Sequence, residues 1–293
     1  MLTSRDVREF VAAATPGARR LAPAVRFSVI MPSFNQAPFI ERSLNSVINQ
    51  EYEGVELIVM DGGSQDGTCK LLERYSGHIA HWRSERDEGQ SDALNKGFRA
   101  ATGEIFGWLN SDDLYLPGAL HHVAQIFATR PDVAVVYGDW LMIDEHDRIL
   151  ERCPALPPSR TRLVTEGFFC NAQAMFWRQS LHERLGELDV RLHYTMDFDL
   201  FLRMISVAGP QAFFRTPRPL GCFRVYAGQK TGSATDKGAN EHRRVIERAG
   251  LTWKYAPYGR ALRLAYRITR AAEYIGRQGP RYLLLKLTGR PAA

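Results

Sequence analysis

Three short apolar runs, each ending in small polar or acidic residues, constrain the fold more than any other feature of the sequence. The runs are FSVIM at 27–31, VELIVM at 55–60 and EIFGWL at 104–109, with a fourth, VAVVYG, at 133–138. Helical patterns separate them, at about 38–49, 64–72 with Ser64 as N-cap, 90–101 and 117–129. This alternation is typical of right-handed βαβ units. We therefore expect an α/β fold: a Rossmann-like nucleotide-binding layer with a mostly parallel mixed sheet.

The pattern becomes less regular after about residue 139. We expect a hairpin at 139–150, a helix at 197–207, strands near 211–223 divided by a turn at Pro217–Pro219, and a helix at 239–249. The predicted organisation is an N-terminal extension (1–25), a main domain (26–253) and a helical tail (254–293). The main domain would have two halves, one at about 26–139 and one at about 140–253.

Composition excludes several classes of protein. Of 293 residues, 45% are hydrophobic and 24% are charged, which excludes a disordered, collagen-like or disulfide-scaffold chain. No stretch approaches 18 consecutive apolar residues, and the N-terminus lacks the apolar core of a secretory signal. The four cysteines are far apart with no CxxC pair, which argues against a zinc knuckle. A cytoplasmic location is the simplest expectation.

The tail carries the positive charge of the chain. Residues 254–293 hold nine basic residues and one acidic residue, a net charge of +8 against +6 for the whole chain. The overall charge is therefore no argument for a nucleic-acid partner, and we predict none. One helical face of the tail is apolar: Ala261, Leu264, Ala265, Ile268, Ala272 and Ile275. Such a basic amphipathic helix suits an anionic membrane surface, here the inner face of the cytoplasmic membrane, or packing on the catalytic domain or a second subunit. Both readings stay open, as does the oligomeric state.

Polar and acidic residues follow three of the predicted strands. They are Pro32-Ser33-Phe34-Asn35, Asp61-Gly62-Gly63-Ser64 and Asn110-Ser111-Asp112-Asp113. Ligands of open parallel sheets bind beyond the carboxyl ends of the strands. Clustered carboxylates there favour a hard divalent ion, Mg²⁺ or Mn²⁺, whose remaining ligands a diphosphate would supply. Each acid alone could be a cap or turn former, but three such loops at strand ends favour a ligand site.

These segments have a familiar order. FSVIMPSFNQAPFIERSLNSVINQEYEGVELIVMDGGSQDGT, SERDEGQSDALNKGFRAATGEIFGWLNSDD and MDFDLFLRM strongly resemble motifs of the inverting family 2 glycosyltransferases, which have the glycosyltransferase A-type fold. The resemblance covers about 26–226. It implies that 26–253 is a catalytic domain, with a donor half at about 26–139 and an acceptor half at about 140–253. It implies transfer of a sugar from a UDP- or dTDP-sugar to a hydroxyl of a saccharide or lipid-linked saccharide, in polysaccharide, lipid-linked oligosaccharide or glycoconjugate assembly, with Mn²⁺ or Mg²⁺.

The resemblance also implies roles on the donor side. The first-strand loop would line the base, and Asp61 would accept the N–H of a uracil or thymine ring. Asp112 would contact the ribose and Asp113 would bind the ion. The predicted donor-binding residues are Pro32, Ser33, Phe34, Asn35, Asp61, Asp92, Lys96 and Asp112. Core packing is the alternative for Phe34, and a solvated helix face is the alternative for Lys96.

On the acceptor side, the resemblance makes Asp197 the catalytic base, in preference to Asp199. Asp199 and Arg203 form an i,i+4 pair on the same predicted helix. Arg224 and Lys230 suit a cationic flap over a diphosphate. Tyr226 stands where relatives often have a histidine, so this chain would lack any metal ligand that the histidine provides.

Two other classes of function fit the sequence less well. A nucleotidyltransferase would show a Gly-rich, basic phosphate loop after the first strand, where this chain has PSFNQ. A non-catalytic nucleotide-sugar-binding or scaffolding protein would have no need of the four acids Asp61, Asp112, Asp113 and Asp197 together. The sequence therefore favours a metal-dependent, inverting glycosyltransferase.

Overall fold

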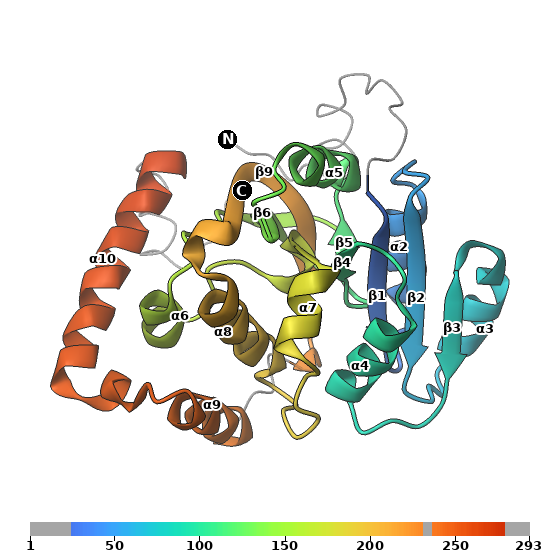
Figure 1. Ribbon diagram of the computed structural model, residues 1–293. Coiled ribbons are helices and arrows are strands. Elements are labelled where there is room, and N and C mark those ends of the chain that lie inside the picture. Colours follow the sequence, from blue (N-terminus) through green and yellow to red (C-terminus); the bar gives the residue numbers. More distant parts are fainter. Residues whose placement is uncertain (1–24, 231–235, 279–293) are drawn as a thin grey trace.

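The computed structural model describes residues 25–230 and 236–278 (Figure 1). Its central strand is β1 (Phe27–Ser33), whose seven residues are all buried. Apolar side chains on both faces of a strand are typical of a sheet covered by helices on both sides. The other strands are β2 (Val55–Asp61), β3 (His81–Ser84), β4 (Ile105–Trp108), β5 (Leu114–Tyr115), β6 (Val135–Ile143), β7 (Ile149–Cys153), β8 (Met175–Arg178) and β9 (Phe213–Arg224).

In the described residues these strands form one mixed sheet in the order β3-β2-β1-β4-β8-β6-β9-β5, with β7 paired to β6. The first four strands are parallel to one another, as predicted. Ser33 is paired with Asp61, and Ile30 with Trp108, so β1, β2 and β4 end at the same edge. This register brings the three predicted polar loops together.

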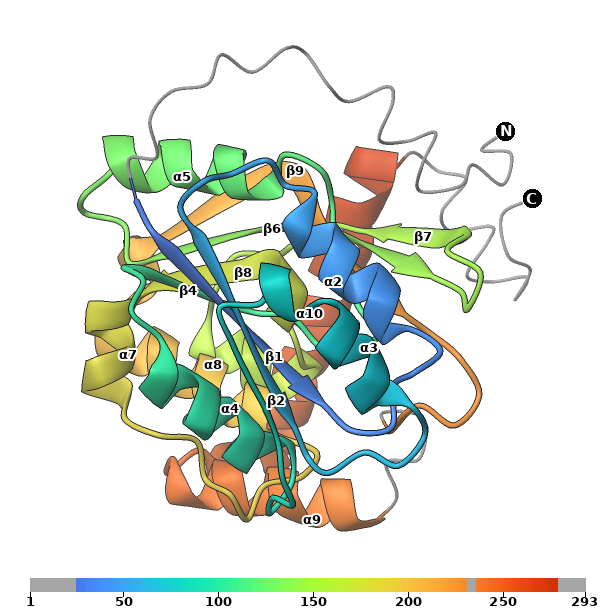
Figure 2. The ribbon, with the colours of Figure 1, turned by 90° about the vertical axis from the view of Figure 1, so that its right-hand side faces the viewer.

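The helices are α2 (Ile40–Ile48), α3 (Thr68–Arg74), α4 (Gln90–Ala100), α5 (Ala119–Thr129), α6 (Arg160–Glu166), α7 (Gln179–Leu185), α8 (Met196–Ala208), α9 (Asp236–Arg248) and α10 (Pro257–Gln278). Short 3₁₀ turns lie at Ser76–His78, Ala172–Ala174, Pro210–Ala212 and Thr252–Tyr255. Figure 2 shows α2 and α3 side by side. Helix α4 packs on β1 and β2, where Gly97 allows the approach: a Cβ there would lie 2.5 Å from Ile30.

Two local predictions were wrong. Ser64 does not cap α3, which begins at Thr68 after Gly67 in the left-handed conformation; the Ser64 side chain hydrogen-bonds to Asp61 instead. The segment 211–223 is not two strands with a turn, because β9 is continuous from Phe213 to Arg224. Its prolines are accommodated where the pairing with β6 shifts register, around Asp139, and proline is tolerated at such irregularities.

The C-terminal half builds outward from the sheet. Helix α8 packs against α7 and α6, and α6 packs against α10, which is the outermost helix in Figure 1. No helix among residues 25–230 and 236–278 is long and apolar enough to cross a membrane. Residues 1–24 of the predicted extension (1–25) and residues 279–293 of the predicted tail lie outside the described residues, as do residues 231–235, which follow Lys230.

Candidate functional site

Hydrogen bonds join the three strand-end loops. The Asn35 N–H donates to Ser64 Oγ at 2.7 Å, and Asn35 Oδ1 accepts from the Gln65 N–H at 3.0 Å. Asn35 has a φ of 52°, a conformation that asparagine tolerates better than most residues. Ser111 Oγ donates to the Pro32 carbonyl at 3.0 Å. Asn35 and Pro32 therefore hold the loops at one edge of the sheet through contacts within the protein.

Phe34 and Ser33 face this edge in different ways. Phe34 is 60% exposed, so the alternative that it packs in the core is excluded. An exposed ring at a strand end offers a flat apolar surface for a base. Ser33 is buried, and its hydroxyl has no hydrogen-bond partner in the described structure. An unpaired buried hydroxyl is costly unless a ligand or water completes it.

Asp61 lies at the end of β2, as predicted, but its carboxylate is directed into its own loop. Oδ2 accepts from the N–H groups of Gly63 and Ser64 at 3.1 and 2.8 Å, and from Ser84 Oγ at 2.7 Å. Oδ1 accepts from Ser64 Oγ at 2.6 Å. With only 2% of the residue exposed, Asp61 organises the loop. Its predicted contact with the base stays a prediction.

The acidic pair after β4 has one accessible member. Asp113 is fully buried, and its oxygens accept from the Arg224 N–H at 2.9 Å and from Asn110 Nδ2 at 3.1 Å. Burial, and then the neighbouring Asp112, raise the pKa of Asp113 well above its usual range. Asp112 is partly exposed, and burial raises its pKa as well. This placement argues against the predicted role of Asp113 as the ion ligand and favours Asp112.

Tyr226 extends over Asp112. Its hydroxyl donates to Asp112 Oδ2 at 3.0 Å and accepts from Gln36 Nε2 at 3.3 Å. Burial raises the pKa of Tyr226 to about 12, so it remains a neutral hydrogen-bond donor. Tyr226, which stands where relatives often have a histidine, therefore lies beside the acidic pair.

Arg224 corrects the prediction of a cationic flap. Its side chain is fully buried and paired with Asp147, with 2.6 Å between Nη1 and Oδ1. It also donates to the carbonyls of Asp112 and Asp144 at 2.7 and 2.8 Å. Arg224 thus holds the loop of the acidic pair through buried contacts within the protein, and it is not available to a ligand.

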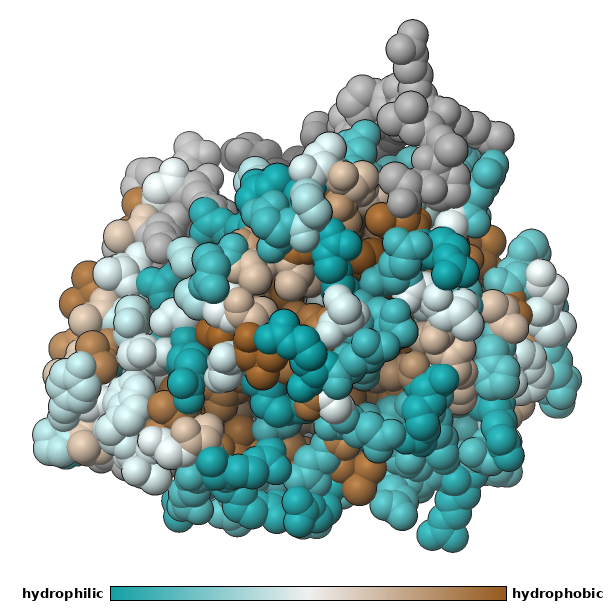
Figure 3. Space-filling model, in the orientation of Figure 1, coloured by the Kyte–Doolittle hydropathy of each residue, from teal (hydrophilic) through white to brown (hydrophobic). Residues whose placement is uncertain are grey.

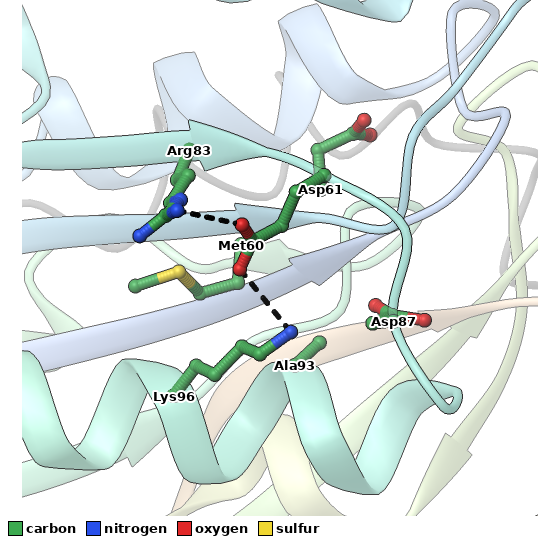
Figure 4. Close-up of a pocket in the computed structure, with 7 residues that line it drawn as sticks. Met60, Asp61, Arg83, Asp87, Ala93 and Lys96 are labelled. Carbon is green, nitrogen blue, oxygen red and sulfur yellow. Dashed lines mark ion pairs between the residues drawn. The ribbon is translucent and has the colours of Figure 1, made fainter.

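Lys96 and Asp92 of α4 are engaged with each other. Their ion pair is 3.0 Å long, and Lys96 also lies 3.3 Å from Glu85. These two partners raise the pKa of Lys96 against the opposing effect of burial. Figure 4 shows the adjoining pocket, which is lined by Met60, Asp61, Arg83, Glu85, Asp87, Ala93 and Lys96. The predicted donor contacts of Asp92 and Lys96 would require exchange of these ion pairs.

Asp197 lies in the first turn of α8, as predicted for the base. Its Oδ1 accepts from the Phe198 N–H at 2.8 Å, and the residue is partly exposed. Removal of water by the surrounding protein raises the pKa of Asp197 to about 6, although the positive charge of Lys230 opposes the shift. A carboxylate with this pKa is ionised at neutral pH and is a stronger base than an ordinary aspartate.

Lys230 is linked through Gln90 to the loop of the acidic pair, and its charge acts on Asp197. Its ammonium group donates to Gln90 Oε1 at 3.2 Å and lies 5.7 Å from the centre of the Tyr194 ring. Gln90 in turn donates to Asn110 Oδ1 at 2.8 Å. Gln90 is not among the predicted site residues, and its only signal in the sequence is its place at the start of a predicted helix. This chain of contacts, Asn110–Gln90–Lys230, runs from the loop of Asp112 towards Asp197.

Asp199 and Arg203 do not belong to the acceptor side of the site. Asp199 is 4% exposed; Oδ2 pairs with Arg203 Nε at 2.8 Å and Oδ1 pairs with Arg248 of α9. Arg203 also donates to the Leu185 carbonyl at 2.8 Å. These residues tie α8 to α7 and α9, which corrects their predicted placement and agrees with the i,i+4 pair.

Glu241 of α9 positions the segment before α8. Its Oε2 accepts from the N–H groups of His193 and Tyr194 at 3.0 and 2.8 Å. Glu241 is 4% exposed. No local sequence pattern predicts this role, because its two partners lie 47 and 48 residues earlier. Through these bonds α9 fixes the backbone of the segment that precedes Asp197.

The acidic pair suits a divalent ion only with help from a ligand. No group of three or more His, Cys, Asp or Glu side chains that could hold a metal ion occurs in residues 25–230 and 236–278. Mg²⁺ and Mn²⁺ often take one or two carboxylates and complete their shell with phosphates and water. The partly exposed Asp112 beside buried Asp113 fits such a site.

Comparison with known proteins agrees with this geometry. A model of a family described as "Glycosyl transferase family 2" matches residues 28–185. An uncharacterized glycosyltransferase of Rickettsia typhi is 30% identical over 218 residues, which cover 72% of this chain and 67% of that protein. The chain is 28% identical to an uncharacterized glycosyltransferase of Rickettsia felis, but spans only 31% of its length.

Solved structures share the fold. S. aureus TarS (1–349) in complex with UDP-GlcNAc matches with a TM-score of 0.60 and 17% identity, covering 75% of this chain and 65% of that chain. The mannosyltransferase PcManGT from Pyrobaculum calidifontis, in complex with GDP-Man and Mn²⁺, matches with a TM-score of 0.52 and 18% identity, covering 97% and 84%. The predicted glycosyltransferase A-type fold is thus confirmed.

Proposed function

Because the chain belongs to glycosyl transferase family 2, we propose that it transfers a sugar from a uridine or thymidine diphosphate sugar to a hydroxyl group, with inversion at the anomeric carbon. The observation that carries this proposal is the contact chain from the loop of Asp112 through Gln90 to Lys230, towards Asp197. This contact chain supports a single site in which a diphosphate would bind near Asp112 and Asp197 would act as the base on the acceptor.

Asp197 would act on the acceptor hydroxyl. Its carboxylate would take the proton as the hydroxyl oxygen attacks the anomeric carbon, on the face opposite the leaving diphosphate. A single displacement with one base forms no covalent intermediate, and it therefore inverts the configuration. The pKa of about 6 suits this task at neutral pH.

The donor would be held on the side of the strand-end loops. The exposed Phe34 ring offers a surface for the base, and Asp112 is the carboxylate that would hold Mg²⁺ or Mn²⁺ together with the diphosphate. When bound, the ion would supply positive charge beside the phosphates. Lys230, at the mouth of the site, would add a second positive charge.

We also propose that the acceptor is a saccharide or a lipid-linked saccharide used in polysaccharide or glycoconjugate assembly, and that α10 places the enzyme on an anionic membrane. Leu264 and Ile268 of α10 are each 62% exposed. The helix packs on α6 through a different face, where Arg162 lies 5.2 Å from the Tyr266 ring centre and donates to Thr269 at 3.3 Å. The apolar face predicted from the sequence is therefore the one turned to solvent.

Charge supports an anionic lipid as the partner of this face. Arg260, Arg263 and Arg267 are exposed on the same helix. Figure 3 shows hydrophobic residues among hydrophilic ones along the left edge, where Figure 1 places α10. Each basic residue near an anionic leaflet contributes about 1 kcal/mol, and exposed apolar side chains add to that.

Vesicle sedimentation tests this surface. We expect the full chain to bind phosphatidylglycerol vesicles, to bind phosphatidylcholine vesicles weakly, and to dissociate as salt rises. The double variant Leu264→Glu, Ile268→Glu should lose binding by about tenfold or more, because charge replaces the apolar area that would be buried in the lipid. Leu150→Glu, at a 39% exposed position on β7, is the matched control. Equal binding by the double variant would refute a lipid surface. If the wild type is a dimer and the two substitutions dissociate it without changing lipid binding, the face is a subunit contact instead.

A further inference from the structure

We propose that Asp147, in the turn between β6 and β7, is a positioning residue for the ion site. Its negative charge holds the guanidinium of Arg224 at the turn, so that the carboxylates of Asp112 and Asp113 stay available to a divalent ion. The inference rests on the ion-dependent transfer proposed above. Three observations carry it: the burial of Arg224, the charges that meet at Asp147, and the contacts of the guanidinium with the loop of the acidic pair.

Arg224 is a buried cation whose charge requires a partner. Its side chain is 0% exposed, and Nη1 lies 2.6 Å from Asp147 Oδ1. Within residues 25–230 and 236–278, Asp147 is the one carboxylate that forms an ion pair with Arg224. The Nη2 atom is buried and has no hydrogen-bond partner in the same ranges. A buried charge with a single ionic partner depends strongly on that partner.

The turn at 144–148 brings a second arginine to Asp147. Nη1 of Arg42, on α2, lies 3.1 Å from the same oxygen, and it also donates to the Glu145 carbonyl at 3.0 Å. Asp147 Oδ1 accepts no hydrogen bond in the part of the chain that the structure describes, because the angles of both contacts are unsuitable. The attraction between opposite charges, and not a directional bond, therefore links Asp147 to the two arginines.

The same guanidinium lies against the loop of the acidic pair. Its Nε donates to the Asp112 carbonyl at 2.7 Å, and the backbone N–H of Arg224 donates to Asp113 Oδ1 at 2.9 Å. Burial raises the pKa of both acids, and the positive charge of Arg224 opposes the shift in each. The acidic pair therefore experiences the charge of Arg224 even while Asp147 balances it.

A divalent ion and Arg224 would compete for the same negative charge. With Asp147 ionised, the guanidinium is balanced at the turn, and the pair keeps its charge for the ion. Without that balance, the charge of Arg224 would act more strongly on Asp112 and Asp113 and would repel a second cation there. Asp147 would thus control the ion affinity of two carboxylates without contacting the ion.

Phe39 adds an aromatic link between the arginines and Asp112. Its ring centre lies 5.0 Å from Arg224 Cζ and 5.3 Å from Arg42 Cζ. The centre of the Tyr226 ring is 4.5 Å from that of Phe39, and the Tyr226 hydroxyl donates to Asp112 Oδ2 at 3.0 Å. Displacement of the Arg224 guanidinium would therefore also disturb the ring whose hydroxyl orients Asp112.

Calorimetric titration of the full chain with Mn²⁺ in the presence of UDP, corrected for Mn²⁺ binding to UDP alone, tests the inference. Asp147→Asn keeps the shape of the side chain, and asparagine tolerates the φ of 66° at this position. The variant should bind Mn²⁺ about tenfold more weakly. Its transfer rate should approach that of the wild type at saturating Mn²⁺, because the ligand carboxylates themselves are unchanged.

Two single variants separate this role from a general effect on the turn. Glu145→Gln removes the same charge from an exposed side chain two residues away. Arg42→Gln removes the ion pair between the turn and α2 but leaves Asp147 paired with Arg224. Both variants should bind Mn²⁺ as the wild type does. A loss in Arg42→Gln equal to that in Asp147→Asn would show that only the position of the turn matters, and it would refute the role of the charge.

A double variant tests the charge balance directly. Asp147→Asn, Arg224→Gln removes both charges, so no unbalanced cation remains beside the acidic pair. It should bind Mn²⁺ more tightly than Asp147→Asn, whereas two purely structural losses would add and make it the weakest variant. Melting temperatures show which variants are folded. If the double variant does not fold, the comparison of Asp147→Asn with the two single controls decides.

The outcomes distinguish this inference from the proposed function. If the wild type binds Mn²⁺ with UDP and Asp147→Asn binds it equally well, the role of Asp147 is refuted while the ion site stands. If the wild type binds no Mn²⁺ in the presence of UDP, the proposed ion site is wrong, and the role of Asp147 fails with it.

Discussion

Replacing Asp197 with Asn is expected to slow sugar transfer by about 10²–10⁴-fold, while UDP and Mn²⁺ binding stay unchanged. Asparagine keeps the shape of the side chain but cannot take a proton from the acceptor. The position of Asp197 in the first turn of α8, partly exposed and near Lys230, fits a base and not a structural acid. Rate and nucleotide affinity are measured separately, by single-turnover kinetics and calorimetry.

The pH profile supplies an independent test of the same role. The pKa of Asp197 is raised to about 6, and only the ionised form can act as a base. Activity should therefore be full above this pH and fall about tenfold per unit as pH drops below it. In Asp197→Asn the residual activity should lose this acid limb.

Asp199 provides the control on the same helix. Both of its oxygens are paired with arginines, so Asp199→Asn should lower the melting temperature, whereas its chemical step should remain close to that of the wild type. A folded Asp199→Asn that is inactive, beside an Asp197→Asn that is active, would reverse the assignment.

The second large effect is expected from the ion site. EDTA should abolish transfer, and Mn²⁺ or Mg²⁺ should restore it. Asp112→Asn should weaken Mn²⁺ binding in the presence of UDP by about tenfold or more and reduce transfer by at least as much, because it removes the accessible ligand carboxylate. Mn²⁺ affinity is measured by titration with UDP bound.

Asp113→Asn is the informative comparison. Asp113 is the buried member of the pair and accepts hydrogen bonds from Arg224 and Asn110, so its neutralisation should act mainly through stability. Normal Mn²⁺ binding by Asp112→Asn together with its loss in a folded Asp113→Asn would restore the original prediction. Full activity in EDTA would show that sugar transfer does not depend on a divalent ion.

The fold was largely predictable because each apolar run is short, β-branched and ended by polar residues. Parallel pairing of β1 with β2 and β4 then brings the strand ends together without any further information. The errors arose where local propensity was overridden by distant contacts. Ser64 has a strong capping propensity, yet its hydroxyl bonds to Asp61, and α3 begins after Gly67.

The site was predictable by position but not by role. Asp61, Asp112 and Asp197 all lie at the predicted places, but hydrogen bonds decide which carboxylates remain available. Arg224 and Asp113 have plausible ligand chemistry and are used within the protein instead. The contributions of Gln90 and Glu241 depend on partners 140 and about 48 residues away, and no local pattern records such contacts.

The measurement that tests the account most directly is the release of nucleoside diphosphate from a panel of nucleotide sugars by the full chain, with and without Mn²⁺. We predict release of UDP or dTDP from at least one of their sugars, only with the ion present, and no release of GDP or ADP. Release of GDP alone, release that is unaffected by EDTA, or no release from any sugar of the panel in either condition would contradict the account.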